Sequence, residues 1–110
     1  MSEKSLFRGD MPTTAGTAEY TVPTGYKTYV TNVDICNTTA GILTPAVHLV
    51  PSGGSAGTTN MLFPNPNLLA NQMVQWEGRQ EMVVGDFIQC IGSSAGLTIH
   101  ITGEEVRVST

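Results

Sequence analysis

The stretch that decides the fold is Tyr29-Val-Thr-Asn-Val-Asp-Ile-Cys-Asn-Thr-Thr-Ala-Gly-Ile-Leu-Thr-Pro-Ala-Val-His-Leu-Val-Pro-Ser-Gly-Gly-Ser-Ala-Gly-Thr58. It holds the densest run of β-branched residues in the chain, interrupted by turn-forming residues. Apolar and polar residues alternate in it with period two, which predicts strands at 29–36 and 44–50. We expect these two strands to form the central hairpin of the fold, with a glycine- and serine-rich loop at 51–57 behind them.

The same pattern continues outward in both directions from this stretch. Turn-forming residues separate short β-rich segments, and no segment shows a sustained helical period. The predicted strands are 19–22, 26–36, 42–50, 60–63, 72–77, 81–84, 86–91 and 97–102, with 103–110 as a charged edge strand and Gly78-Arg-Gln80 as a turn. The sequence therefore predicts an all-β protein, an antiparallel β-sandwich or a jelly-roll-like barrel of about eight short strands.

The chain of 110 residues has the length of one domain. Residues 1–18 are polar and are interrupted by Gly9, Pro12 and Gly16, so we expect them to form an extended N-terminal arm. Residues 19–110 then form a single β-sandwich domain. The arm either is a disordered terminus or lies across a neighbouring subunit.

Charged residues make up only 13% of the chain, about half the usual share. A surface of Thr, Asn, Ser, Gln and Gly suits a protein that packs against copies of itself or a larger assembly. The net charge is −4 and the five basic residues are scattered, so we expect no binding to nucleic acid. No apolar run reaches the roughly 20 residues that span a bilayer, and the N-terminus lacks a signal-peptide core. We therefore expect synthesis in a cytosol and no membrane contact.

The residues that could carry chemistry are scattered over different predicted strands. They are the acids Asp34, Asp86, Glu104 and Glu105, the histidines His48 and His100, and the thiols Cys36 and Cys90. No nucleophile–base pair, carboxylate pair or metal-ligand spacing follows from their positions. We expect no enzyme activity, no cofactor and no metal. Both cysteines are expected to be buried free thiols, with a disulfide open only if their strands are neighbours. His48 is expected at the surface or in an interface.

A series of short motifs gives the sequence a family likeness. They are Tyr20-Thr-Val-Pro-Thr-Gly25, Val33-Asp-Ile-Cys-Asn-Thr-Thr39, His48-Leu-Val-Pro-Ser-Gly-Gly54, Val74-Gln-Trp-Glu-Gly78, Val84-Gly-Asp-Phe-Ile88 and Ala95-Gly-Leu-Thr-Ile-His-Ile-Thr-Gly-Glu-Glu105. Each motif is mostly turn residues and β-formers, and their order carries the likeness. In this order the chain resembles small virion proteins of tailed bacteriophages, a group of β-sandwich modules in capsid decoration proteins, head fibres and tail proteins. The first 18 residues lie outside the resemblance.

The resemblance implies a non-enzymatic structural protein of the virion, assembled in the host cytoplasm. We expect a capsid decoration (cement) protein, a homotrimer that binds the major capsid protein at capsomer junctions. The alternative is a tail or fibre component, including a host-surface or glycan-binding module. A free carbohydrate-binding module would need an aromatic platform, which only Tyr20, Tyr26, Tyr29 and Trp76 could supply. The candidate assembly contacts are Leu6, Phe7, Arg8, Trp76 and His48.

Overall fold

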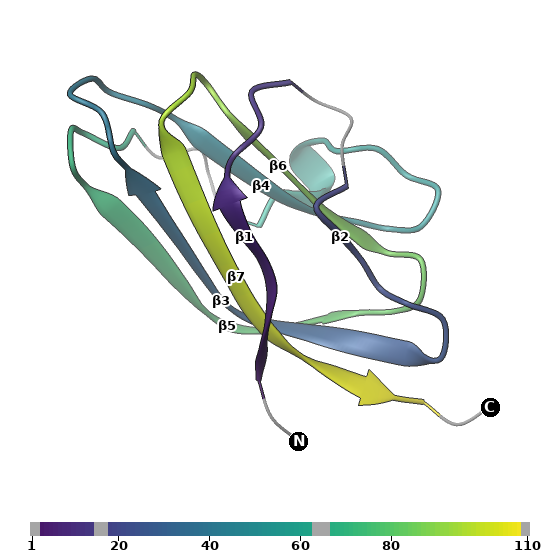
Figure 1. Ribbon diagram of the computed structural model, residues 1–110. Coiled ribbons are helices and arrows are strands. Elements are labelled where there is room, and N and C mark those ends of the chain that lie inside the picture. Colours follow the sequence, from purple (N-terminus) through teal and green to yellow (C-terminus); the bar gives the residue numbers. More distant parts are fainter. Residues whose placement is uncertain (1–2, 15–17, 63–66, 109–110) are drawn as a thin grey trace.

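The computed structural model describes residues 3–14, 18–62 and 67–108, and they form two antiparallel sheets (Figure 1). The four-stranded sheet has the order β1 (Lys4–Asp10), β7 (Leu97–Arg107), β3 (Tyr26–Asn37) and β5 (Met73–Met82). The three-stranded sheet has the order β2 (Tyr20–Thr21), β6 (Phe87–Gly92) and β4 (Pro45–Val50). A single 3₁₀ turn, η1 (Thr58–Asn60), is the only helical element among the described residues. The predicted all-β class is confirmed, and within it the sandwich rather than a closed barrel.

The predicted central hairpin is wrong. Both sides of β3 are already occupied, by β7 and by β5, so β4 cannot pair with it. The chain crosses instead to the other sheet through residues 38–44, and β4 pairs with β6. Backbone hydrogen bonds between Leu43 and Leu68, 3.0 and 2.8 Å long, hold the crossing segment against residues 67–69. The decisive stretch therefore spans the two layers of the sandwich.

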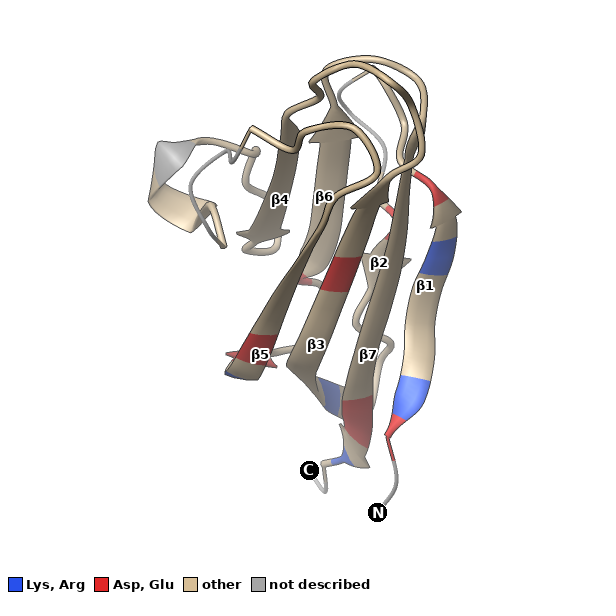
Figure 2. Cartoon of the chain, turned by 90° about the vertical axis from the view of Figure 1, so that its left-hand side faces the viewer, with Lys and Arg blue, Asp and Glu red and all other residues tan. Residues whose placement is uncertain are grey.

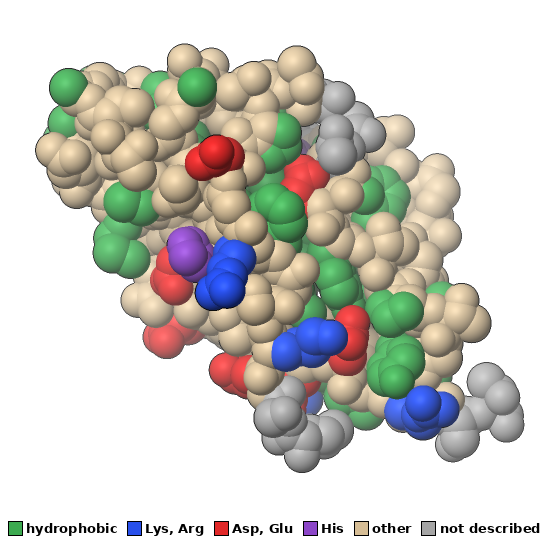
Figure 3. Space-filling model, viewed as in Figure 1, with side chains coloured by type: hydrophobic (Ala, Val, Ile, Leu, Met, Phe, Trp, Pro, Cys, Tyr) green, Lys and Arg blue, Asp and Glu red, His purple; other side chains and the backbone are tan. Residues whose placement is uncertain are grey.

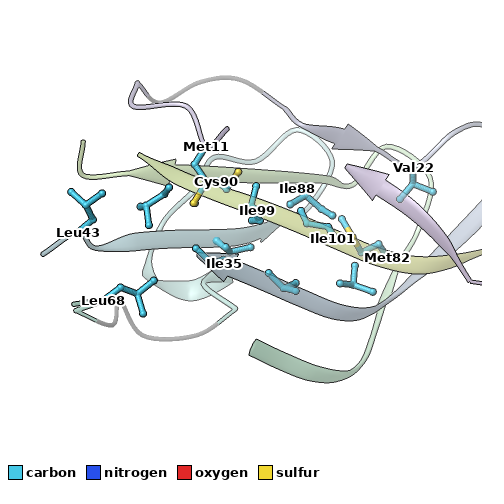
Figure 4. Packing of buried hydrophobic residues seen from close by; sticks show 14 residues of the cluster. Met11, Val22, Ile35, Leu43, Leu68, Met82, Ile88, Cys90, Ile99 and Ile101 are labelled. Atoms are coloured by element: carbon cyan, nitrogen blue, oxygen red, sulfur yellow. The ribbon is translucent and has the colours of Figure 1, made fainter. Parts of the chain in front are cut away.

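The core lies between the sheets and is filled by aliphatic side chains from both (Figure 4). Leu97, Ile99 and Ile101 of β7 face inward, as the alternation in the sequence predicts, and meet Ile88 and Cys90 of β6. The strict alternation predicted for β3 fails at one point. A register shift between Val30 and Asn32 turns the strand over, so that Val30 is buried along with Val33 and Ile35.

The N-terminal segment differs from the expected arm. Residues 4–10 form β1, which pairs with β7 of the same chain, and Met11 is 4% exposed in the core. A strand with Leu6 and Phe7 on its half-buried side gains apolar contact by adding to this sheet, which explains why the segment folds back. Residues 1–2 and 15–17 of the expected arm lie outside the described residues.

Three further predictions about strand limits need correction. The predicted turn at residues 78–80 is part of β5, which runs without a break to Met82. Residues 103–107 do not form a separate strand, because they extend β7; Gly103 still pairs with Lys4 of β1, whereas residues 104–107 pair with β3 alone. The predicted strand at 60–63 is instead the end of η1 followed by an isolated bridge from Met61 to His48, and Phe63 lies outside the described residues.

Candidate functional site

The chemistry-bearing side chains stay dispersed in the fold. Within residues 3–14, 18–62 and 67–108, no three His, Cys, Asp or Glu side chains gather in a way that could hold a metal ion. Cys36 lies in the four-stranded sheet and Cys90 in the three-stranded sheet, and both are free thiols. Cys90 is buried as expected, whereas Cys36 is only half-buried. Among the described helical residues, none belong to a helix that could cross a membrane. The features that stand out are surfaces instead of catalytic groups.

The sandwich has four edge strands, and three of them are blunted in ways that discourage further pairing. β1 is bulged between Ser5 and Phe7, and β2 is only two residues long. β4 is covered where Met61 bridges His48 and the Leu62 amide donates a 2.8 Å hydrogen bond to the Val47 carbonyl. The fourth edge strand is β5, which is ten residues long and whose ladder with β3 shifts register at residues 78–79. Within the described part of the chain its outer side pairs with no strand. We call this side of residues 73–83 the β5 edge.

Alternating charges mark the outer face of β5. Arg79 donates a 2.9 Å hydrogen bond to Glu104 and its guanidinium lies 3.9 Å from the ring centroid of Tyr29. Glu81 forms an ion pair with Lys27, with 3.2 Å between Oε2 and Nζ. Charged residues lie on the strands of the four-stranded sheet, whereas β2, β4 and β6 have none (Figure 2). The basic side chains visible in Figure 3 lie between the middle and the lower end of the molecule in that view.

A cleft of about 420 Å³ opens between the two sheets on the side of β4 and β5. β4 does not extend over the inner side of β5, which leaves Gln80 exposed even though it points toward the opposing sheet. The cleft is lined by Leu49, Pro51, Thr59, Asn60, Met61, Leu62, Gln80, Glu81, Met82 and Asp86. Apolar side chains, amides and carboxylates are therefore mixed in one concave surface that adjoins the β5 edge.

Three large apolar side chains are exposed together at one end of the sandwich. Ile42 and Leu69 flank the Leu43–Leu68 bridge, and Met73 follows the tight turn of residues 69–72. They are 62%, 50% and 60% exposed. We call Ile42, Leu69 and Met73 the end patch. At the opposite end of β5, Val83 and Val84 are also about half exposed.

The structure does not bring the predicted contact residues into one site. Leu6 and Phe7 are half-buried on β1 against the core, whereas Arg8 is exposed and pairs with His100 of β7. Trp76 lies on β5, at the other edge of the same sheet, with its indole over Gly78. A Cβ on Gly78 would come within 2.8 Å of the Trp76 ring, so glycine is what lets the indole lie along the strand.

The expected surface position of His48 is wrong, because this side chain is 7% exposed. Its Nδ1 atom lies 3.1 Å from the Gly57 carbonyl oxygen and 3.0 Å from Asn60 Oδ1. Asn60 in turn accepts a hydrogen bond from the Gly57 amide and donates one to the Ser55 carbonyl. His48 thus anchors the glycine-rich loop and η1 against β4, and its role in this fold is structural.

Sequence reasoning missed the end patch and the charges on β5. The end patch is formed by residues far apart in sequence, so no local pattern indicates it. The charges did leave a signal, because Glu77, Arg79 and Glu81 alternate at the spacing of one strand face. Reading Gly78 as a turn residue hid that signal.

The chain was compared with known proteins and protein families. No protein-family model, no curated protein and no solved structure matches the chain. The fold and the surfaces described above are therefore the basis for a functional proposal.

One buried carboxylate opposes stability at neutral pH. Glu19 Oε1 lies 3.7 Å from the Cys90 thiol, and Oε2 is buried without a hydrogen-bond partner among the described residues. Burial raises the pKa of Glu19 above its ordinary value, and burial, together with the nearby Glu19 carboxylate, raises the pKa of Cys90. Because the folded state holds the Glu19 proton more tightly than the unfolded state, the molecule loses stability as pH rises through that folded pKa.

We therefore expect Glu19→Gln to raise the free energy of unfolding at pH 7 by up to about 1 kcal/mol. At a pH below the ordinary carboxyl pKa the two proteins should be equally stable, because Glu19 is then protonated in both states. Urea titrations at both pH values measure the difference. The control is the same type of substitution at an exposed residue, Glu3→Gln. A variant that is less stable than the parent at pH 7 would contradict the prediction.

Proposed function

We propose that this chain is a non-enzymatic structural protein of a bacteriophage particle, a capsid decoration protein that binds the major capsid protein at junctions between capsomers. Its place of action is then the virion, and its partners are the capsid shell and other copies of itself. The proposal rests on the resemblance of the motifs in the sequence and on the surfaces of the fold. A homotrimer, the form that the resemblance implies, is part of the proposal.

The observation that carries the proposal is the end patch. A small protein gains nothing in stability from three large apolar side chains in water at one end, and such clusters mark surfaces that contact other proteins. The chain keeps them beside a surface with few charges, which lowers the cost of removing water on contact. A capsid offers many identical sites, so a modest contact at each copy is enough for firm attachment of an array.

The end patch also has a firm support. The turn of residues 69–72 is closed by hydrogen bonds between Leu69 and Gln72, 2.9 and 3.1 Å long. The neighbouring segment is bonded to it through the Leu43–Leu68 pair. Little conformational freedom would be lost when such a patch binds, and this favours affinity.

Binding to capsids tests the proposal directly. The purified chain should co-sediment with expanded capsids that lack a decoration protein and should raise the temperature at which they break apart. Replacing Ile42 and Leu69 by aspartate should weaken this binding at least about tenfold, because two apolar contacts are lost and two charges would be buried.

The matched control places the same two charges at the other end of the molecule, in Thr21→Asp/Thr24→Asp. Both threonines are exposed beside the turn that enters β3. This variant should bind capsids like the parent chain. If the parent chain binds neither expanded nor unexpanded capsids, or if both variants bind equally, the proposed function is wrong.

The cleft favours one second candidate, a tail or fibre module that binds a host-surface glycan. Its lining combines Asn60, Gln80, Glu81 and Asp86 with aliphatic side chains, and sites for polar ligands combine such groups. The tyrosine and tryptophan side chains that could form an aromatic platform do not line it. Binding to host cells or glycans, lost on Gln80→Ala, together with no binding to capsids, would favour this candidate.

A further inference from the structure

We infer that the β5 edge is a self-association surface, on which the β5 strands of two copies of this chain pair antiparallel about a two-fold axis at Gly78. The two four-stranded sheets then form one continuous sheet of eight strands. This inference does not depend on the proposed function, because it follows from the edge alone.

The four edges of the sandwich differ in how far they are covered. β1 is bulged, β2 is very short, and β4 is covered by another segment of the chain. β5 presents ten residues of backbone that no segment of the described chain covers, although its ladder with β3 shifts register at residues 78–79. Unprotected edges of this length are templates for pairing with another strand. β5 is therefore the longest edge strand that the described chain leaves uncovered.

The charges along β5 are complementary to those on the β5 strand of a second copy. In an antiparallel pair centred on Gly78, residues whose numbers sum to 156 face each other, so Glu77 of each copy faces Arg79 of the other. Opposite charges directly across a pair of strands stabilise it. Further along, Gln75 faces Glu81, and Met73 faces Val83. These last two apolar side chains are 60% and 53% exposed in the single chain, and the pairing would cover both.

Neighbouring registers lack this match. Centring the pair on Arg79 sets two arginines opposite each other and Glu77 opposite Glu81. Centring it on Glu77 sets two glutamates opposite each other. Like charges directly opposite destabilise a strand pair. The Gly78 register also uses the full length of β5, which is nearly symmetric about this residue.

The inner face of the β5 edge also favours this pairing. Trp76 is half-buried and lies over Gly78, so the two indoles would meet above the pair of glycines at the axis. The Trp76 of the second copy faces Gln80, which lines the cleft next to Leu49, Met61 and Leu62. Apolar surface that the single chain leaves open on both sides of β5 would then be covered.

Charge reversal provides a sharp test. Sedimentation velocity from about 1 µM to 1 mM should show the parent chain forming dimers, or dimers of trimers if the proposed trimer also forms through another surface. Glu77→Arg alone and Arg79→Glu alone each set like charges opposite one another twice, and should raise the dissociation constant about tenfold or more. An equal mixture of these two variants should associate like the parent chain, because the mixed pair restores both contacts. The double variant Glu77→Arg/Arg79→Glu should do so as well.

Controls separate this effect from loss of folding. Arg8→Glu reverses an exposed charge on β1, at the other edge of the sheet, and should leave association unchanged. Arg79→Glu also removes contacts with Tyr29 and Glu104 within one chain, but the double variant carries this loss in both chains and the mixed pair carries it in one. Trp76 is the only tryptophan, so its emission should shift to shorter wavelength as the concentration of the parent chain rises.

Three results would overturn the inference. One is a parent chain that stays monomeric over the whole concentration range. Another is that both single variants associate as strongly as the parent chain. This result includes the case in which all variants form the same trimer. The third is two weakened variants that do not recover when mixed.

Discussion

Replacing Gly103 by alanine is expected to destabilise the protein by about 3 kcal/mol or more, a large share of the stability of a small domain. Gly103 lies buried in β7 between Lys4 of β1 and Val30 of β3. A Cβ at this position would overlap the carbonyl oxygen of Tyr29 and press on Leu6. The overlapping atom is backbone in the middle of the sheet, so it cannot move aside as a side-chain end can.

Gly41→Ala is the matched control for this prediction. Gly41 lies in an exposed loop, a Cβ there meets nothing within 4 Å, and its backbone does not require glycine. Its replacement should change stability by less than about 1 kcal/mol. Urea unfolding followed by the fluorescence of Trp76 measures both variants. Equal midpoints for Gly103→Ala and Gly41→Ala would show that β7 can move away from β3 at this point.

The position of Gly103 also illustrates what the sequence can predict about the fold. Regular alternation in 97–102 indicates a strand and its inward face correctly, because that signal is local. The same strand continues through Gly103 to Arg107, although glycine and a pair of glutamates favour an end there. What holds residues 103–107 in the sheet is pairing with β3, and at Gly103 also with β1, and both strands lie far away in sequence. Local propensity carries no record of those partners.

The pairing of the strands could not be predicted from the sequence for the same reason. Two adjacent strands with a short link predict a hairpin, and only the competition of β5 and β7 for the sides of β3 excludes it. The surfaces follow this topology. Neither the end patch nor the β5 edge can be predicted before it is known that residues 38–43 meet 67–72 and that β5 ends the sheet. The alternating charges of β5 are the one part of the candidate surface that the sequence does show.

Replacing Asn37 by alanine is expected to cost about 2–4 kcal/mol of stability, and to disturb the end patch as well. This side chain is completely buried. Its Nδ2 group donates hydrogen bonds to the carbonyls of Gly41, Leu68 and Leu69, at 2.8, 2.9 and 3.2 Å. Its Oδ1 atom accepts from the amide and the hydroxyl of Thr39. Alanine removes all of these partners and leaves buried backbone groups unpaired.

Two further variants make the test specific. Asn37→Asp has the same shape but would turn a carboxylate toward three carbonyl oxygens, so it should destabilise more than alanine at pH 7 and recover in part as pH falls and the carboxyl is protonated. Asn32→Ala removes an amide of β3 whose bonds are to Asp34 and Gln75 side chains on the outer face, and should cost less than about 1 kcal/mol. Thermal unfolding at both pH values ranks the three variants.

The same amide connects stability to the proposed function. Asn37 bonds to both segments carrying Ile42 and Leu69, and thus reinforces the Leu43–Leu68 backbone pair and the Thr44–Asn67 hydrogen bond that also join them. A folded Asn37→Ala chain should therefore bind capsids more weakly than Asn32→Ala, although neither change touches an exposed apolar residue. Equal capsid binding by these two variants would mean that the end patch does not need its support, or that it is not the surface that binds.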